Sequence, residues 1–337
     1  MKSIVCVQPN ELLMTDEQVP SLVEGEALVQ IKRIGICGTD QHAYKGNQPY
    51  FTYPRVLGHE LSGIVMDIDP NVKHLKKGDQ VAIIPYLHCE NCIACKQGKT
   101  NCCEKIKVIG VHEDGGMREV LSVPTSHLLV TNNLSLDAAA LLEPLAIGAH
   151  AVRRAEIKRG ENVLVIGAGP IGLGIMVFAR DQGANVIAMD VNEERLQFCK
   201  KWGEVGATVN ALHQPIEELL DVTDGNMPSV VIDATGNLQS MKQSFHYISH
   251  GGKLVYVGLV KDDISFYDPD FHKRETTLLG SRNATIEDFE YVQHVLAKGE
   301  VDIPTYITHR CSFEDMMGEF ENWLQPESKV IKAIVEL

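Results

Sequence analysis

The rhythm of hydrophobic and polar positions along the chain changes near residue 162. Over about the first 135 residues, short apolar stretches alternate with turns rich in Gly, Pro and Asn, which predicts β-strands. Glu26–Ile36 alternates apolar and polar residues, and 61–68 and 80–85 are further predicted strands. Residues 136–155 are rich in Ala and Leu and predict a helix that begins near Ser135 and is interrupted by Pro144.

From Asn162 onward, predicted strands alternate with predicted helices. Residues 163–166, 186–189, 230–233 and 253–257 are continuous apolar runs, while 171–182 and 193–202 have helical patterns. Continuous apolar strands separated by helices predict a parallel sheet that is covered on both faces. After about residue 282 the chain returns to helix and strand outside this pattern.

Composition narrows the function classes. The 337 residues suit two domains, and 44% hydrophobic and 23% charged residues are typical of a soluble globular protein. The net charge of −14 argues against a nucleic acid or an acidic membrane as partner. We find no stretch typical of a transmembrane helix or a signal peptide. Nine cysteines without an export signal indicate reduced thiols and metal ligands, so we expect a cytoplasmic protein.

Four cysteines in one polar loop have the spacing C-x2-C-x2-C-x7-C: Cys89, Cys92, Cys95 and Cys103. This spacing predicts a structural zinc site, which four thiolates would close against any further ligand. An iron–sulfur cluster is an alternative, but its ferredoxin run has a shorter last gap and a following Pro. Plain buried thiols are another alternative, and Cys102 competes with Cys103 as the fourth ligand on spacing alone.

A second group of candidate metal ligands is Cys37 with His59 and Glu60. A lone Cys is usually a core residue and a lone His-Glu pair is usually structural, so each segment alone is weak. Together a Cys, a His and a carboxylate can hold zinc and leave one coordination position open, where zinc acts as a Lewis acid. Glu143, next to Pro144, is a candidate for a further ligand or for a carboxylate behind the ligands.

The third motif is a glycine-rich turn, Gly167-Ala168-Gly169-Pro170-Ile171-Gly172. It follows a predicted strand, opens a predicted helix and is followed by Asp190 at the end of the next strand, a context that predicts dinucleotide binding. Asp190 would bind the adenosine ribose hydroxyls and repel a 2′-phosphate, so NAD is favoured over NADP. Arg195 weakens this preference unless it is merely solvated. The alternative is a glycine turn that binds no nucleotide.

These residues resemble the zinc-containing medium-chain alcohol dehydrogenase family over essentially the whole chain. The matching pieces are Gly35-Ile36-Cys37-Gly38-Thr39-Asp40, Gly58-His59-Glu60, the four-cysteine loop, Gly78-Asp79-Gln80-Val81-Ala82, Glu143-Pro144 and the glycine turn. The resemblance implies that Cys37, His59 and Glu143 surround a catalytic zinc, with Glu60 beside or behind them. Glu143, where many relatives have Cys, points to the polyol-type branch. Asp69 departs from the family's usual glycine but still suits a turn.

The resemblance also implies the architecture and the mechanism. We expect an α/β protein with a GroES-like β domain (1–150 and 285–337) that carries two zinc ions, and a doubly wound Rossmann domain (151–284) that binds NAD. A secondary hydroxyl of the substrate would bind zinc and give its proton to Thr39. A relay through the ribose and His42 would pass the proton to solvent, and hydride would go to the nicotinamide.

A closer resemblance is to the hexonate 5-dehydrogenases, which oxidise L-galactonate or L-gulonate. It lies in Gly46-Asn47-Gln48-Pro49-Tyr50-Phe51, Thr100–Ile106, Phe271–Thr277 and Gly280–Thr285. A sugar acid carries a carboxylate, for which Arg282 is the candidate partner, with Asn283 beside it. Arg282 could also be structural, and His42 a plain surface residue.

Other functions stay open at this point. The chain could instead be a sorbitol-type polyol dehydrogenase or an L-threonine dehydrogenase. It could also be a regulator that binds zinc and NAD without catalysis. A third alternative is an enzyme of the same superfamily that resembles quinone reductases and lacks zinc. We expect a homo-oligomer, either a dimer or a tetramer, that acts on a small molecule and binds neither nucleic acid nor membrane.

Overall fold

The computed structural model describes residues 1–48 and 51–337, so Pro49 and Tyr50 of the hexonate-type segment lie outside the described residues. The chain divides into two compact units, Met1–Glu143 with Thr285–Leu337, and Pro144–Ala284. The sequence places the first boundary at 150/151 instead, inside the helix α4 (Leu142–Ala155). Among the described residues, no helix is long and apolar enough to cross a membrane.

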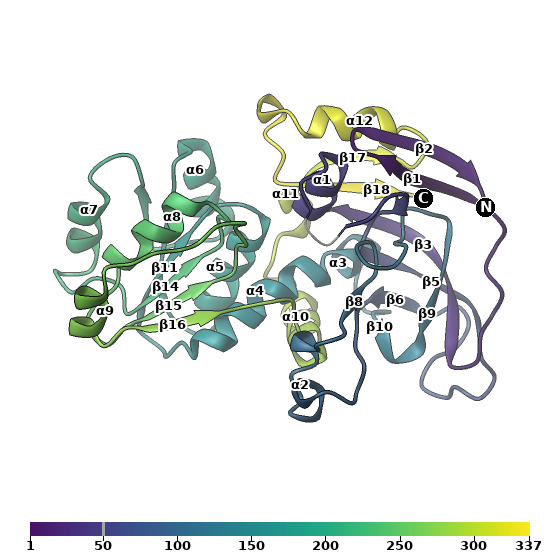
Figure 1. Ribbon diagram of the computed structural model, residues 1–337, viewed down its shortest axis with the longest axis horizontal. Helices are drawn as coiled ribbons and strands as arrows, with labels where there is room; N and C mark the ends of the chain where they lie inside the picture. The colour runs from purple at the N-terminus through teal and green to yellow at the C-terminus, as the bar shows by residue number, and fades with distance from the viewer. Residues whose placement is uncertain (49–50) are drawn as a thin grey trace. The chain divides into compact units, whose positions relative to one another are not determined.

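The first unit is built from β-strands in three sheets (Figure 1). The largest runs in the order β10-β6-β5-β3-β18-β17, with β9 also paired to β3; a second is β2-β1-β4 and a third β7-β8. The strands are β1 (Lys2–Gln8), β2 (Glu11–Asp16), β3 (Glu26–Ile36), β4 (Arg55–Val56), β5 (Glu60–Ile68), β6 (Gln80–Ile83), β7 (Tyr86–Leu87), β8 (Lys107–Val108), β9 (Val120–Pro124), β10 (Leu128–Val130), β17 (Ile307–Ser312) and β18 (Lys332–Glu336).

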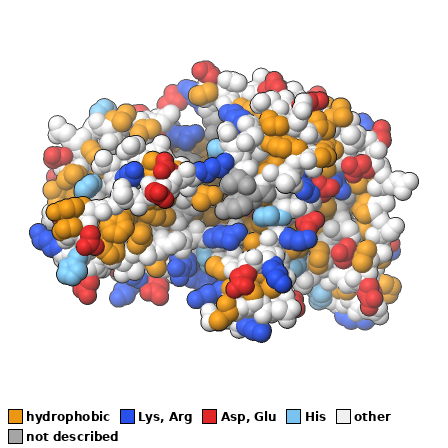
Figure 2. All heavy atoms as spheres, viewed as in Figure 1, with side chains coloured by type: hydrophobic (Ala, Val, Ile, Leu, Met, Phe, Trp, Pro, Cys, Tyr) orange, Lys and Arg blue, Asp and Glu red, His pale blue; other side chains and the backbone are white. Residues whose placement is uncertain are grey.

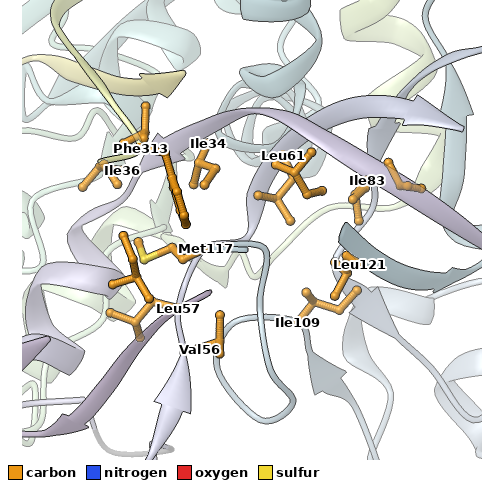
Figure 3. Packing of buried hydrophobic residues seen from close by; sticks show 14 of the residues in the cluster. Ile34, Ile36, Val56, Leu57, Leu61, Ile83, Ile109, Met117, Leu121 and Phe313 are labelled. Carbon is orange, nitrogen blue, oxygen red and sulfur yellow. The ribbon is translucent and has the colours of Figure 1, made fainter. Parts of the chain in front are cut away.

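The long strand β3 is the centre of this unit. It has the bounds that its alternating pattern predicts, and it pairs antiparallel with β5, β9 and the C-terminal strand β18. The inward-facing side chains of these strands form one buried hydrophobic core, in which Ile34, Leu61 and Ile83 pack with Met117 and Phe313 (Figure 3). Burial of this apolar surface is the main force that holds the two ends of the chain in one unit.

Short helices connect and cover these strands. They are α1 (Gly38–Tyr44), α2 (Ile93–Lys96), α3 (Leu136–Ala140), α10 (Ile286–Ala297), α11 (Ile303–Tyr306) and α12 (Met316–Trp323), with single 3₁₀ turns at Thr100–Cys102, Thr125–His127 and Pro326–Ser328. Two aromatic residues of α12, Phe320 and Trp323, are buried in the same core.

The second unit is a six-stranded parallel sheet in the order β13-β12-β11-β14-β15-β16 (Figure 1). This is the strand order of a doubly wound dinucleotide-binding fold, so the α/β prediction is confirmed. The strands are β11 (Asn162–Ile166), β12 (Asn185–Asp190), β13 (Ala207–Asn210), β14 (Val230–Asp233), β15 (Lys253–Tyr256) and β16 (Thr277–Gly280). The helices are α5 (Pro170–Asp181), α6 (Glu193–Trp202), α7 (Pro215–Val222), α8 (Leu238–Gln243) and α9 (Asp268–Arg274), with a 3₁₀ turn at Ser244–His246.

The helix predicted over 136–155 is two helices, α3 and α4, and the interruption is not at Pro144. Ser135 begins α3 as predicted, because its side chain accepts a hydrogen bond from the backbone N–H of Ala138. Helix α3 ends at Ala140 with Leu141 as its C-cap, and α4 starts at the next residue, Leu142. Pro144 therefore lies in the first turn of α4, where no backbone N–H donor is needed and proline is tolerated.

The last strand of the parallel sheet departs from the fully buried pattern. β16 is an edge strand whose residues are mostly exposed, including Leu278. Leu259, Phe266 and Tyr267, in the segment between β15 and α9, are exposed as well. Figure 2 shows hydrophobic side chains exposed over this unit, with acidic and basic side chains interspersed on the face in view.

Asp69 stands where the resembled family usually has glycine, and the structure explains how the turn is made. Its carboxylate accepts hydrogen bonds from the backbone N–H of Gly25 at 2.6 Å and of Asn71 at 2.9 Å. These two donors lower the pKa of Asp69. The carboxylate thus ties the turn after β5 to the start of β3.

We expect Asp69→Asn to lower the free energy of unfolding near neutral pH. The amide has one acceptor oxygen and no charge, so it cannot replace both hydrogen bonds of the carboxylate. Since the folded-state pKa is lowered, the wild-type advantage is present above the usual Asp pKa of 3.8 and is lost as the pH falls through the folded-state value. Urea unfolding across pH 7 to 3 measures this, with the exposed Asp16→Asn as control. A difference that stays constant over this range would contradict the interpretation.

Candidate functional site

The four-cysteine loop converges on one point. The sulfur atoms of Cys89, Cys92, Cys95 and Cys103 lie within 4.8 Å of one another, and Cys92 Sγ is 3.4 Å from Cys95 Sγ. Zinc–sulfur bonds of 2.3 Å in a tetrahedron place the sulfurs about 3.8 Å apart, so the donor set fits this ion. Cys102 is exposed and outside the group, which assigns the fourth position to Cys103.

Backbone donors in this loop favour thiolates. Cys103 Sγ accepts from the N–H groups of Cys89 and Lys105, each at 3.3 Å. The backbone N–H of Cys95 lowers the pKa of Cys92 to about 6, while desolvation raises the pKa of Cys95 to about 12. Four sulfurs this close share protons in the absence of a cation, and a bound cation would deprotonate them all.

The second predicted ligand group is brought together by strand register. Cys37 directly follows β3, His59 and Glu60 lie at the start of β5, and the two strands pair so that Gly35 is opposite Glu60. One ligand atom from each of Cys37, His59 and Glu60 lies within 4.8 Å of the others. His59 and Glu60 are buried, and Cys37 is half-buried.

A buried carboxylate that sequence reasoning did not single out, Asp40, organises these ligands. It caps α1 by accepting from the backbone N–H of Cys37 at 2.9 Å, and it accepts from Gly58 N–H at 3.1 Å. Its Oδ1 lies 3.6 Å from His59 Nδ1. A carboxylate behind a histidine orients the ring so that the other nitrogen can bind a metal. Burial raises the pKa of Asp40, although the facing His59 opposes the rise.

Glu60 has a buried partner from the other end of the chain. Lys332 Nζ lies 2.7 Å from each of the two carboxylate oxygens, and both side chains are at most 1% exposed. Burial lowers the pKa of Lys332, but the nearby acidic groups, Glu60 first among them, together raise this pKa by more than burial lowers it, so the net shift is upward. Only the folded chain reveals this pair, since Lys332 belongs to no motif.

Glu143 is buried beside this group and has one uncommitted oxygen. Tyr86 donates its hydroxyl to Glu143 Oε1. Glu143 Oε2 and His59 Nδ1 are buried without a hydrogen-bond partner among the described residues. Burial raises the pKa of Glu143 to about 7, since the nearby His59 offsets only part of the desolvation. Thiol, imidazole and carboxylate donors with an orphaned buried oxygen fit a divalent cation such as zinc.

The glycine turn has the geometry of a nucleotide-binding loop. Gly167 begins the turn directly after β11 and has a φ of +100°. A Cβ at Gly172 would lie 1.8 Å from Gly167 O, so the third glycine permits helix and strand to pack closely. A Cβ at Gly169 would meet nothing within 4 Å, which leaves open space at the N-terminus of α5. Pro170 and Ile171 form the first turn of that helix, where backbone N–H groups favour a phosphate.

Asp190 ends β12 next to this turn, as predicted. Its Oδ2 accepts from the backbone N–H of Ala168 at 2.7 Å and its Oδ1 from Asn192 N–H at 2.9 Å. Arg195 is exposed in the first turn of α6, and its backbone N–H donates to the side chain of Asn192.

The remaining predicted residues lie on two segments. Thr39 and His42 are three residues apart in α1, which places them on neighbouring helix positions; Thr39 is half-buried and His42 exposed. Arg282 and Asn283 follow β16 in the second unit. Arg282 is exposed, and Asn283 has a φ of +52° and a buried side-chain nitrogen without a partner among the described residues.

Comparisons with known proteins agree with this geometry. Residues 23–133 match the model of the alcohol dehydrogenase GroES-like domain, and residues 170–298 match that of the zinc-binding dehydrogenase family. A curated relative, the L-galactonate-5-dehydrogenase of Escherichia coli K12, is 46% identical over 335 residues, which are 99% of this chain and 98% of the relative.

Two solved structures share the whole fold. One, described as a short chain alcohol dehydrogenase (rspB) from Escherichia coli CFT073 complexed with NADH, has a TM-score of 0.93 and 30% identity, and the match covers 100% of this chain and 99% of that one. The other, from Sinorhizobium meliloti 1021, is assigned to the zinc-binding dehydrogenases and is bound to NADP. Its TM-score is 0.92 with 28% identity, over 100% of this chain and 99% of that one.

The sulfur cluster generates a prediction with a matched control. Cys103→Ser removes one of the four converging sulfurs and is expected to lower the zinc content from about two ions per chain to about one and to lower the melting temperature. Cys102→Ser changes the neighbouring exposed thiol and is expected to alter neither. Metal analysis and thermal unfolding measure both effects. Equal zinc loss in the two variants would show that the assignment of the fourth ligand is wrong.

Proposed function

Because this chain belongs to the family of zinc-binding alcohol dehydrogenases and is therefore a zinc-dependent oxidoreductase acting on CH–OH groups with NAD(P), we propose that it oxidises the C5 hydroxyl of a hexonate with NAD. The substrate would be L-galactonate or L-gulonate, and the product the corresponding keto-acid. The observation that carries this proposal is the 46% identity with an L-galactonate-5-dehydrogenase over nearly the full length of both chains.

We assign the catalytic zinc to Cys37, His59 and Glu143, with Glu60 next to them. Their support is the convergence of the first two with Glu60 within 4.8 Å, and the orphaned oxygen of the buried Glu143. When bound, zinc would act as a Lewis acid that lowers the pKa of the substrate hydroxyl. Asp40 would hold the His59 ring in place, and Tyr86 the Glu143 carboxylate.

Proton transfer is assigned to α1. Thr39 follows the ligand Cys37 by two residues, and its backbone N–H points to Cys37 Sγ at 3.5 Å. Its hydroxyl is the group we propose to accept the substrate proton. His42, exposed one turn further along the same helix, would release the proton to solvent.

The cofactor is proposed to be NAD, bound by the turn Gly167–Gly172 and Asp190. Asp190 Oδ2 accepts from Ala168 N–H in the turn and its Oδ1 from Asn192 N–H after β12, which holds the carboxylate beside the turn. This position supports Asp190 as the residue that would bind the ribose hydroxyls. A 2′-phosphate there would meet a like charge. NAD supplies the hydride acceptor, and the protein supplies binding and orientation.

We expect at least about a hundredfold preference for NAD over NADP, since a desolvated like-charge contact costs several kcal/mol. Asp190→Asn removes the charge and keeps one acceptor for the turn, so the preference should narrow by about tenfold or more. The ratio of kcat/KM with NAD to kcat/KM with NADP measures the preference. The variant Arg195→Ala, measured in the same way, tests whether the arginine weakens that preference. Equal efficiency of the wild-type enzyme with both cofactors would refute the assignment.

Arg282 and Asn283 are the proposed substrate residues. A planar guanidinium can bind a carboxylate through two parallel hydrogen bonds, and the exposed Arg282 follows the end of the parallel strand β16. The buried side-chain nitrogen of Asn283, unpartnered within the described residues, is a second donor at this position. An uncharged polyol offers no group for the arginine.

Arg282→Ala should raise KM for the hexonate by roughly ten- to a hundredfold, which corresponds to about 1.5–3 kcal/mol for a charge-assisted hydrogen bond. KM for a neutral polyol should change far less. Arg282→Lys should recover only part of the loss, because an ammonium cannot form the two-pronged contact. NADH absorbance with both substrate types measures the split, and an equal change in both would remove Arg282 from substrate binding.

A substrate panel decides between the functions that sequence reasoning left open. L-galactonate and L-gulonate should be turned over with NAD more efficiently than sorbitol or L-threonine. A better rate with either of the latter would move the enzyme to the polyol or threonine branch. No turnover with any of them, in zinc-replete protein, would favour the regulator.

The remaining expectations concern the protein's setting. The exposed edge strand β16 and the apolar residues near it support the predicted homo-oligomer, because an unpaired, uncharged edge is suited to pairing with a second copy. The thiolate zinc ligands favour a reducing compartment, in line with the cytoplasmic prediction. The assignment of zinc to the first unit and of NAD to the second is part of the same proposal.

A further inference from the structure

Lys332 is a buried lysine placed in direct contact with the candidate metal ligands. Its ammonium donates to Glu60 Oε1 and Oε2, each at 2.7 Å, and to the backbone carbonyl of Ile36 at 3.1 Å. A lysine has three N–H donors, so these three oxygens use all of them. The ammonium is thus fixed between β3 and β5. Its contact on β3, Ile36, is the residue that precedes Cys37.

The position of the Glu60 carboxylate is built into the opposite strand. Gly35 lies across from Glu60, and a Cβ there would be 2.0 Å from Glu60 Oε2 and 2.8 Å from Glu60 Cβ. Any larger residue at Gly35 would displace the carboxylate from its place on Lys332. Two separate strands, β18 and β3, therefore hold Glu60 in the same orientation.

Glu143 is held differently. Within the described residues, the uncharged hydroxyl of Tyr86 donates to Glu143 Oε1, and Glu143 Oε2 has no hydrogen-bond partner. Both oxygens of Glu60 contact a cation, whereas Glu143 keeps one oxygen that no described residue contacts by a hydrogen bond. The two buried carboxylates are therefore not equivalent toward a metal.

The contacts of Lys332 with Glu60 favour one division of roles, and this division is also balanced in charge. Zinc with the Cys37 thiolate, neutral His59 and the Glu143 carboxylate is a neutral set, and Glu60 with Lys332 is a second neutral set. Burial strongly penalises any unbalanced charge. We propose, resting on the zinc site assigned above, that Lys332 is a positioning residue that holds Glu60 off the catalytic metal and so keeps one coordination position free for the substrate hydroxyl.

Removal of the ammonium should reverse this arrangement. In Lys332→Met the Glu60 carboxylate would be buried without a cation, and zinc is the nearest positive charge available to it. Glu60 would then bind the metal as an additional ligand. The metal would be held more tightly, and the position for the substrate would be lost.

The experiment replaces the catalytic zinc with Co²⁺, whose visible absorption is intense with four ligands and weak with five or more. Lys332→Met is expected to weaken this absorption and to slow metal release to a chelator by about tenfold or more. Lys332→Arg should stay close to wild type, and Lys332→Met with Glu60→Gln should return to it. Lys200→Met, an exposed lysine in the second unit, controls for loss of a positive charge.

Each outcome is decisive. An unchanged cobalt spectrum and release rate in Lys332→Met would overturn the inference while leaving the zinc assignment intact. A wild-type chain that binds no cobalt at this site would overturn both. If Lys332→Met does not fold, the variant Glu60→Gln alone tests the proposal. Its cobalt spectrum is expected to match that of the wild type. A spectrum that shows the loss of a ligand would mean that Glu60 binds the resting metal and would overturn the proposal.

Discussion

A buried, ionised carboxylate is costly unless it is paired, and in this chain such a pair joins the C-terminal strand to the candidate metal-ligand group. Glu60 is fully buried, and Lys332 meets both of its oxygens at 2.7 Å. Removing one member of such a buried pair typically costs about 3–5 kcal/mol. The contact therefore places β18 beside β3, and with it the end of the chain in the same sheet as the residues that begin the site.

The same requirement shapes the rest of the cluster. Asp40, Glu143 and Cys37 lie around one buried histidine, and burial raises the pKa of both carboxyl groups. A divalent cation is the natural completion of such a set, because it supplies the positive charge that the described side chains provide only in part. The four-cysteine loop follows the same logic with sulfur alone, but there a bound ion would take up every donor and leave no position open for chemistry.

Much of this could be predicted from the sequence, because the signals are local. The alternation in Glu26–Ile36 predicts the central strand, and the cysteine spacing predicts the group of four close sulfurs. The order of strand, glycine turn, helix and Asp190 predicts the contact between Asp190 and the turn. Lys332 lies 272 residues from Glu60, so their contact depends on sheet order and not on any motif. Asp40 and Tyr86 were overlooked for a similar reason, since only burial and contact distinguish them. The predicted helix break at Pro144 is wrong, because proline breaks a helix interior but is tolerated in the first turn, where Pro144 lies.

The central claim is that two groups of side chains in this chain bind zinc and that only one of them is open to a substrate. A crystal structure measured at the zinc absorption edge tests this most directly, since anomalous scattering locates each ion and the density shows its ligands. The account predicts one ion among Cys89, Cys92, Cys95 and Cys103, and a second held by Cys37, His59 and Glu143 while Glu60 remains on Lys332. A single ion, or Glu60 bound to the second ion in place of Glu143, would contradict it.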